Sequence, residues 1–120
     1  MTAPLHLPPP RLRRLPADDL PTALGRGALL VDIRSAEQRA EQGGVVNALV
    51  IAREGLVGHL DPHSADRIPE ARHHDIEWVI LCAQGYSSAA AVAALHDIGL
   101  HRATDVIGGY QALRDKGILV

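Results

Sequence analysis

Short apolar runs, separated by glycine-rich and polar turns, divide the chain into alternating strand and helix segments. The two most continuous runs cover residues 28–33 and 78–82. Strands in a parallel sheet that is covered on both faces have this pattern, because neither face meets water. Shorter runs predict further strands at 12–15, 48–51 and 104–107, the first of them at an edge of the sheet.

Helices are predicted between these strands. Ser35 and Gln38 form a capping-box pattern that opens a helix ending at Gln42. The segment 89–98 places apolar residues on one helical face, and Gly99 follows it at a position where glycine ends helices. Shorter helices are expected near 18–25, 54–60, 69–74 and 110–116. This alternation implies an open, doubly wound α/β fold around a parallel sheet.

Three segments that contain candidate functional residues directly follow predicted strands. They are residues 32–34, Cys82 and the pair 108–109. Open parallel sheets bind their ligands beyond the carboxyl ends of the strands. We therefore expect the three segments to share one edge of the sheet.

Length and composition limit the classes of protein to consider. The 120 residues suggest a single domain over residues 10–120, preceded by a proline-rich extended arm over residues 1–9. The net charge of −2 argues against a nucleic-acid partner, and no apolar run approaches the ~18 residues of a membrane span. Arg11, Arg13 and Arg14 are expected to face water at a strand edge. The single cysteine excludes an intrachain disulfide and favours a cytoplasmic location.

Cys82 lies between a predicted strand and the helix that begins near Ala89. Backbone N–H groups and the positive end of a helix dipole favour thiolate at such a turn, and therefore lower the pKa of a cysteine. The thiolate is the nucleophilic form. A lone cysteine after an apolar strand is often only a small buried side chain, so the following loop decides between packing and chemistry.

The loop after Cys82 favours chemistry. Gly85 permits a positive φ and a close approach of the backbone to a ligand. Ser87 or Ser88 is a suitable N-cap for the next helix. Successive N–H groups in such a turn form a site for anions, which a purely structural cysteine does not require.

Four segments, in the right order and spacing, resemble the rhodanese family over about residues 10–116. Residues 82–88 are similar to its Cys-x-x-Gly-x-(Arg/Ser/Thr)-Ser active loop, and residues 32–34 to its Asp-x-Arg strand end. Residues 43–48 resemble a degenerate Gly-His-Ile-Pro-Gly-Ala turn, and residues 108–110 a Gly-Gly-aromatic segment. The pattern is most similar to small single-domain rhodanese-like proteins of bacteria.

The resemblance implies a five-stranded parallel sheet flanked by helices and a sulfurtransferase without a metal or organic cofactor. The Cys82 thiolate would attack the sulfane sulfur of a donor such as thiosulfate or a persulfide, and cyanide or a thiol would accept the sulfur from the Cys82 persulfide. A protein could also act as donor or acceptor. The N–H groups and hydroxyls of the loop would hold the persulfide, a role assigned to Ala83, Gln84, Gly85, Tyr86, Ser87 and Ser88.

Residues outside the loop are expected to support it. Ser87 stands where some family members have an arginine, so anion binding would depend on a cation from elsewhere, with Arg34, Arg53 and His59 as candidates. We nevertheless favour a surface or structural role for each of these three.

Further supporting roles concern one carboxylate, two glycines and a tyrosine. Asp32 is expected to accept hydrogen bonds beneath the loop, because a carboxylate too near Cys82 would raise the pKa of the thiol. Gly108 and Gly109 are expected to allow close backbone packing beside the pocket. Tyr86 is expected at the mouth of the pocket.

Other functions remain open. A phosphatase on the same fold needs an arginine six residues after the cysteine, where this chain has Ser88, and its loop is one residue longer. A metal site is not expected, because no histidines are paired at helical spacing near Cys82. A rhodanese-fold binding or sulfur-carrier module that depends on a partner is the main alternative, and a redox-sensing thiol is related to it.

Overall fold

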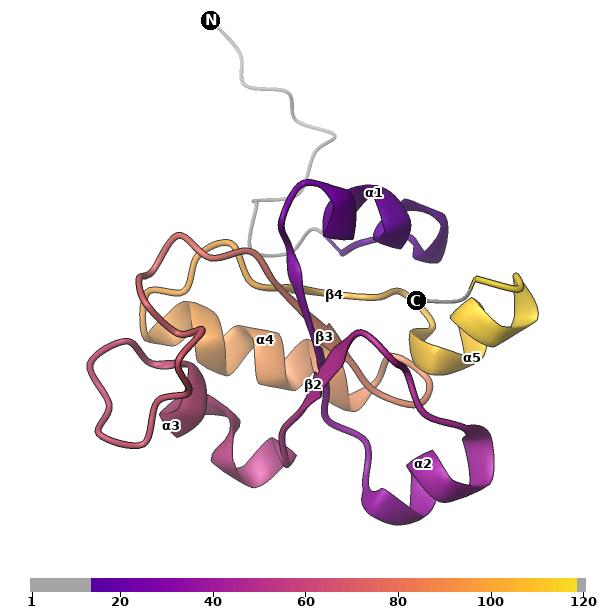
Figure 1. Ribbon diagram of the computed structural model, residues 1–120, viewed down its shortest axis with the longest axis horizontal. Helices are drawn as coiled ribbons and strands as arrows, with labels where there is room; N and C mark the ends of the chain where they lie inside the picture. Colours follow the sequence, from indigo (N-terminus) through magenta and orange to yellow (C-terminus); the bar gives the residue numbers. More distant parts are fainter. Residues whose placement is uncertain (1–13, 119–120) are drawn as a thin grey trace, which may run out of the picture.

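A computed structural model describes residues 14–118 and shows a parallel sheet covered by helices (Figure 1). The sheet has the strand order β2-β1-β3-β4, and every neighbouring pair is parallel. The strands are β1 (Leu29–Asp32), β2 (Ala48–Val50), β3 (Trp78–Leu81) and β4 (Thr104–Asp105). The predicted doubly wound α/β class is therefore confirmed.

The sheet has four strands in the described part of the chain, whereas five were expected. Leu15 makes only an isolated parallel bridge to Val106, with its N–H donating to the Asp105 carbonyl at 2.8 Å. Pro16 follows directly and has no N–H to extend the ladder. The rest of the predicted 12–15 strand and the arm over residues 1–9 lie outside the described residues.

The helices are α1 (Leu20–Gly25), α2 (Ala36–Gln42), α3 (Leu56–Leu60), α4 (Ser87–Asp97) and α5 (Gly109–Asp115), with 3-10 turns at Ala17–Asp19 and Arg53–Gly55. The predicted capping box of α2 is confirmed: the Gln38 N–H donates to Ser35 Oγ, and the Ser35 N–H donates to Gln38 Oε1. The helix expected at 69–74 is wrong, because that segment forms turns. None of the helices in residues 14–118 has the length and apolar character needed to cross a membrane.

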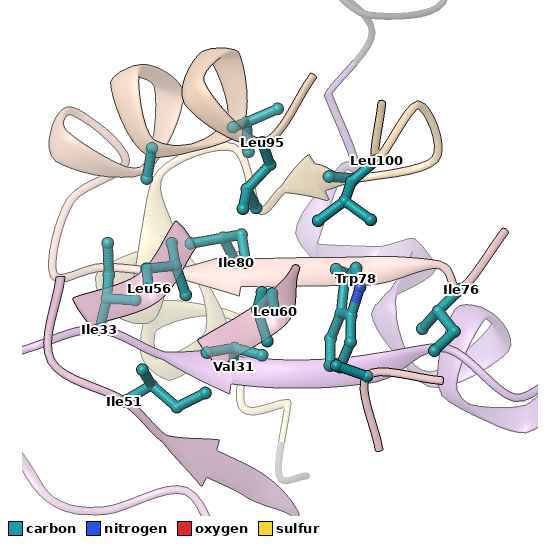
Figure 2. Packing of buried hydrophobic residues seen from close by; sticks show 14 of the residues in the cluster. Val31, Ile33, Ile51, Leu56, Leu60, Ile76, Trp78, Ile80, Leu95 and Leu100 are labelled. Carbon is teal, nitrogen blue, oxygen red and sulfur yellow. The ribbon is translucent and has the colours of Figure 1, made fainter. Parts of the chain in front are cut away.

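The two faces of the sheet carry separate apolar clusters. Figure 2 shows Val31 and Ile80 facing Leu56 of α3 and Leu95 of α4. On the other face, residues of β1 and β3 pack against α1 and α5, among them Leu30, Val79, Leu81, Leu20 and Leu113. Alternate residues of each strand point to opposite faces, which explains why the sequence of both central strands is almost continuously apolar.

Candidate active site

Cys82 directly follows β3, and its sulfur is held from two sides. The Gly85 N–H donates to Sγ at 3.0 Å, and the thiol donates to Ser88 Oγ at 3.2 Å. The loop between Cys82 and α4 can curl around the sulfur because Gly85 has a φ of +87°. Cys82 is buried, yet it lines the floor of a surface cleft.

The start of α5 holds the same loop from its other side. The Tyr110 N–H donates to the Cys82 carbonyl at 2.8 Å, and the Gln111 N–H donates to the Ala83 carbonyl at 3.0 Å. Gly109 lies so close to the loop that a Cβ there would be 2.5 Å from the Cys82 carbonyl oxygen. Gly108, which has a positive φ, likewise lies against Gly85. The loop after β3 and the turn after β4 thus form one packed unit.

Ser88 lies inside α4 and does not cap it. The N-cap residue of α4 is Tyr86, and no side chain caps this helix end. Ser88 Oγ instead donates to Asp105 Oδ2 at 2.6 Å. Ser88, Asp105 and Cys82 are all buried, so their polar atoms are satisfied by one another.

Arg14 completes this network. Its Nε and Nη2 donate to the two carboxylate oxygens of Asp105 at 2.9 and 2.8 Å, and Nη2 also donates to the Gly85 carbonyl at 2.7 Å. Arg14 is exposed at the edge of the sheet, as expected, but its guanidinium also binds the buried Asp105, which was not expected. Sequence reasoning missed both Arg14 and Asp105, although a carboxylate inside an apolar strand is itself a signal of a buried partner.

The surroundings of the sulfur alter its acidity. Burial alone would raise the pKa of Cys82, because it disfavours the charged form. Hydrogen bonds from the side chain and N–H of Ser88, the Ser87 side chain and the Gly85 N–H outweigh burial and lower the pKa of Cys82 below its ordinary value. Ionisation of the thiol is therefore easier here than in a free cysteine, and the thiolate is the nucleophilic form.

Asp32 and Arg34 form a buried ion pair beside the loop. The carboxylate accepts from Arg34 Nε at 3.0 Å, from Nη2 at 2.8 Å and from the Arg34 N–H at 3.0 Å. Asp32 thus accepts hydrogen bonds in a structural role, as expected, but in the described part of the chain its carboxylate bonds are with Arg34 and not with the loop after Cys82. Asp32 and Arg34 are two residues apart in an extended segment, so their side chains lie on the same side of the backbone and reach each other directly. The Arg34 guanidinium also lies 4.1 Å from the centre of the Tyr110 ring.

A cleft of about 710 Å³ opens above Cys82. Its lining includes Tyr86, Ser87 and three arginines, which are Arg34, Arg39 and Arg53. Tyr86 is 81% exposed at the cleft. His59 is not among the lining residues, and its Nδ1 contacts the Asp66 carbonyl oxygen at 2.8 Å. Within residues 14–118 no group of acidic, histidine and cysteine side chains is arranged to hold a metal ion.

Comparison with solved structures finds similar folds in several proteins. One is a protein of unknown function from Rhodopseudomonas palustris, described as a possible tyrosine phosphatase. It is 29% identical in sequence, the match covers 88% of this chain and 81% of that chain, and the TM-score is 0.77. Another is a rhodanese-related protein from Thermoplasma volcanium, which is 27% identical in sequence. The match covers 88% of this chain and 93% of that chain, with a TM-score of 0.66. A human single-domain sulfurtransferase, at 24% identity, 86% and 96% coverage and a TM-score of 0.70, shares the fold.

None of the curated proteins compared matches the sequence. The family model for the rhodanese-like domain, however, matches residues 16–116. This range contains the four resembling segments, the whole described sheet and the loop around Cys82. The chain therefore belongs to the rhodanese-like domain family.

Proposed function

We propose that the protein is a sulfurtransferase in which Cys82 carries the transferred sulfur. The observation that supports this most strongly is the environment of Sγ: hydrogen bonds from Gly85, Ser87 and Ser88 favour its thiolate form at the floor of an open cleft. Cys82 lines this cleft although it is only 3% exposed, and a thiolate is the nucleophilic form that attack on a donor requires.

In the proposed first step the Cys82 thiolate attacks the outer sulfur of a donor such as thiosulfate. A new S–S bond forms, the original S–S bond breaks, and sulfite leaves with the bonding electron pair. In the second step cyanide or a thiolate attacks the terminal sulfur of the persulfide, and the Cys82 thiolate returns. No oxidant, metal or organic cofactor is needed. The loop N–H groups between Ala83 and Ser88 would stabilise the anionic persulfide.

The cleft indicates the class of substrate. Arg39 and Arg53 line it with Glu54 as the one opposing charge, whereas the charge of Arg34, which also lines it, is neutralised by the buried pair with Asp32. This excess of cations suits an anionic donor. The volume of about 710 Å³ also leaves room for an acceptor larger than cyanide, such as a small thiol or a cysteine of a partner protein. We place the reaction in the cytoplasm, where a reducing environment keeps the only cysteine free.

The test is thiosulfate:cyanide activity together with the intact mass of the protein after exposure to thiosulfate alone. We expect turnover and a one-sulfur adduct, with both lost in Cys82→Ser. An adduct without turnover would instead favour a carrier that needs a protein partner. The absence of both adduct and turnover with thiosulfate and with persulfide donors would refute the proposal.

The phosphatase description of one structural neighbour makes phosphate-ester hydrolysis a useful control reaction. The sixth residue after Cys82 is Ser88, whose hydroxyl is bonded to Asp105. This loop position therefore offers no guanidinium to hold a phosphate in a bidentate manner. We expect no hydrolysis of an aryl phosphate under conditions that give sulfur transfer.

Replacing Arg53 with glutamine should weaken donor binding. Arg53 is exposed at the cleft and contributes one screened positive charge, for which a contribution of about 1 kcal/mol is reasonable. We expect the KM for thiosulfate to rise roughly fivefold, with little change in kcat. Arg72→Gln, at an exposed position that does not line the cleft, is the matched control and should leave KM unchanged. Equal KM values in the two variants would remove Arg53 from the binding site.

A further inference from the structure

The Ser88 hydroxyl has one proton and two neighbours that can accept it. Asp105 Oδ2 lies 2.6 Å from Ser88 Oγ, and Cys82 Sγ lies 3.2 Å from it. The three residues are between 0% and 3% exposed. Because so little of them reaches solvent, the hydrogen bonds that one of them loses must be replaced within the network.

The best arrangement of these hydrogen bonds differs between the two forms of Cys82. With a neutral thiol, S–H donates to Ser88 Oγ, and Ser88 donates to Asp105. A thiolate has no proton to donate and requires donors instead. Ser88 can serve it only by turning its single proton from Asp105 to Sγ. Ionisation of Cys82 therefore removes a hydrogen bond from a buried carboxylate.

Arg14 compensates Asp105 for that loss. Its Nε and Nη2 remain bonded to both carboxylate oxygens at 2.9 and 2.8 Å, and such charge-assisted pairs are stronger than a bond to a neutral hydroxyl. Nη2 also holds the Gly85 carbonyl at 2.7 Å, in the same residue whose N–H donates to Sγ. The sulfur is hydrogen-bonded to Gly85 and Ser88. Arg14 contacts Gly85 directly and contacts Ser88 through Asp105.

We propose that Arg14 and Asp105 are positioning residues that control the hydrogen bonding of the Cys82 sulfur through the Ser88 hydroxyl. Arg14 acts from behind the loop and does not line the cleft above Cys82. It supplies the nearby positive charge that the loop itself lacks. The inference rests on the proposed function, in which the Cys82 sulfur is the reacting atom.

The ionisation of Arg14 agrees with this placement. The hydrogen bond to Asp105 is the main cause that raises the pKa of Arg14, burial opposes it, and attraction by the charges of Asp105 and Cys82 adds to the increase. Arg14 and the Cys82 thiolate therefore stabilise each other. Asp105 has the opposite effect on Cys82. Its negative charge repels a thiolate, and it accepts the Ser88 proton that a thiolate would need, so both favour the neutral thiol.

The two residues should have opposite effects when they are changed. Arg14→Met leaves an uncompensated carboxylate beside the sulfur, so the pKa of Cys82 should rise. Asp105→Asn removes the negative charge and leaves a weaker acceptor for the Ser88 proton, so the pKa of Cys82 should fall. We expect a shift of roughly one unit, the lower end of what a nearby charge produces. The double variant restores the charge balance and should lie between the two single variants.

The experiment is the rate of Cys82 alkylation by iodoacetamide as a function of pH. Cys82 is the only cysteine, so the rate reports on this thiol alone. Below the pKa we expect Arg14→Met to react about tenfold more slowly than wild type, and Asp105→Asn about tenfold faster, as follows from a shift of one pH unit. Arg26→Met, which removes an exposed arginine paired with Glu77, is the matched control and should retain the wild-type profile.

Unchanged profiles, or shifts of both variants in the same direction, would overturn the proposal, because general loosening of the loop does not produce opposite signs. Thermal unfolding establishes that each variant is folded. If Arg14→Met does not fold, the isosteric Asp105→Asn decides alone: a profile moved to lower pH supports the proposal, and an unmoved one refutes it. Alkylation needs no sulfur transfer, so failure of the proposed function would appear as missing turnover with these shifts intact.

Discussion

Gly109→Ala is expected to remove nearly all sulfurtransferase activity and to lower the free energy of unfolding by about 2–4 kcal/mol. The new Cβ would lie 2.5 Å from the Cys82 carbonyl oxygen, 2.8 Å from the Gly85 nitrogen and 2.9 Å from the Ala83 carbonyl carbon. All three neighbours are backbone atoms, so no flexible side chain can move aside. The loop itself must shift, and with it the N–H group that holds Sγ.

The size of the activity loss follows from that movement. A displacement of about 1 Å in catalytic geometry can reduce the rate roughly a hundredfold. We therefore expect kcat/KM for thiosulfate to fall by at least this factor, with the pKa of Cys82 raised because the Gly85 hydrogen bond is weakened. Thiosulfate:cyanide kinetics and urea unfolding measure the two effects separately.

Gly117→Ala provides a matched control. Gly117 has a φ of +66°, close to the +61° of Gly109, but a Cβ at Gly117 would meet no atom within 4 Å among residues 14–118, its chain neighbours aside. Both variants carry the same backbone strain of about 1 kcal/mol, and only Gly109→Ala adds the collision with the loop. Gly117→Ala should therefore keep full activity. Similar losses of activity in the two variants would show that strain, and not the packing of the loop, explains the result at Gly109.

The parts of the fold that depend on local pattern were predictable from the sequence. Neighbouring residues of β1 and β3 are buried on opposite faces, and this double burial is visible as a continuous apolar run. The capping box at Ser35 and Gln38 uses contacts only three residues apart. The sequence 69–74 contains no comparable stop or start signal apart from Pro69, and there the predicted helix is wrong.

The environment of Cys82 was only partly predictable, because half of it comes from distant parts of the chain. The turn glycine and serines are in the loop itself, but Arg14 meets Asp105 across 91 positions. A basic residue beside two other arginines is typical of a solvated edge, so its local sequence does not indicate the bond to Asp105. Ser88 is likewise a residue type that often caps helices, but here its hydroxyl donates to Asp105 and does not cap α4.

Breaking the buried ion pair between Asp32 and Arg34 is expected to have the largest effect on stability. The two side chains are 1% and 0% exposed, and Arg34 holds both carboxylate oxygens. Arg34→Met would leave Asp32 buried and charged without its partner, which typically costs about 3–5 kcal/mol. Since domains of this size have a total stability of about 5–15 kcal/mol, urea unfolding should show a large decrease in the transition midpoint.

The cause of that loss can be separated from the general removal of an arginine. Arg26→Met breaks the exposed pair with Glu77, which should leave the midpoint nearly unchanged because solvent already screens these charges. Asp32→Asn/Arg34→Met removes both buried charges and should recover much of the stability lost in Arg34→Met. If the double variant is as unstable as the single one, the lost packing of Arg34 on Tyr110 explains the loss, and the unpaired carboxylate does not. If the double variant recovers stability, the loss in Arg34→Met comes from leaving the Asp32 carboxylate buried without a partner.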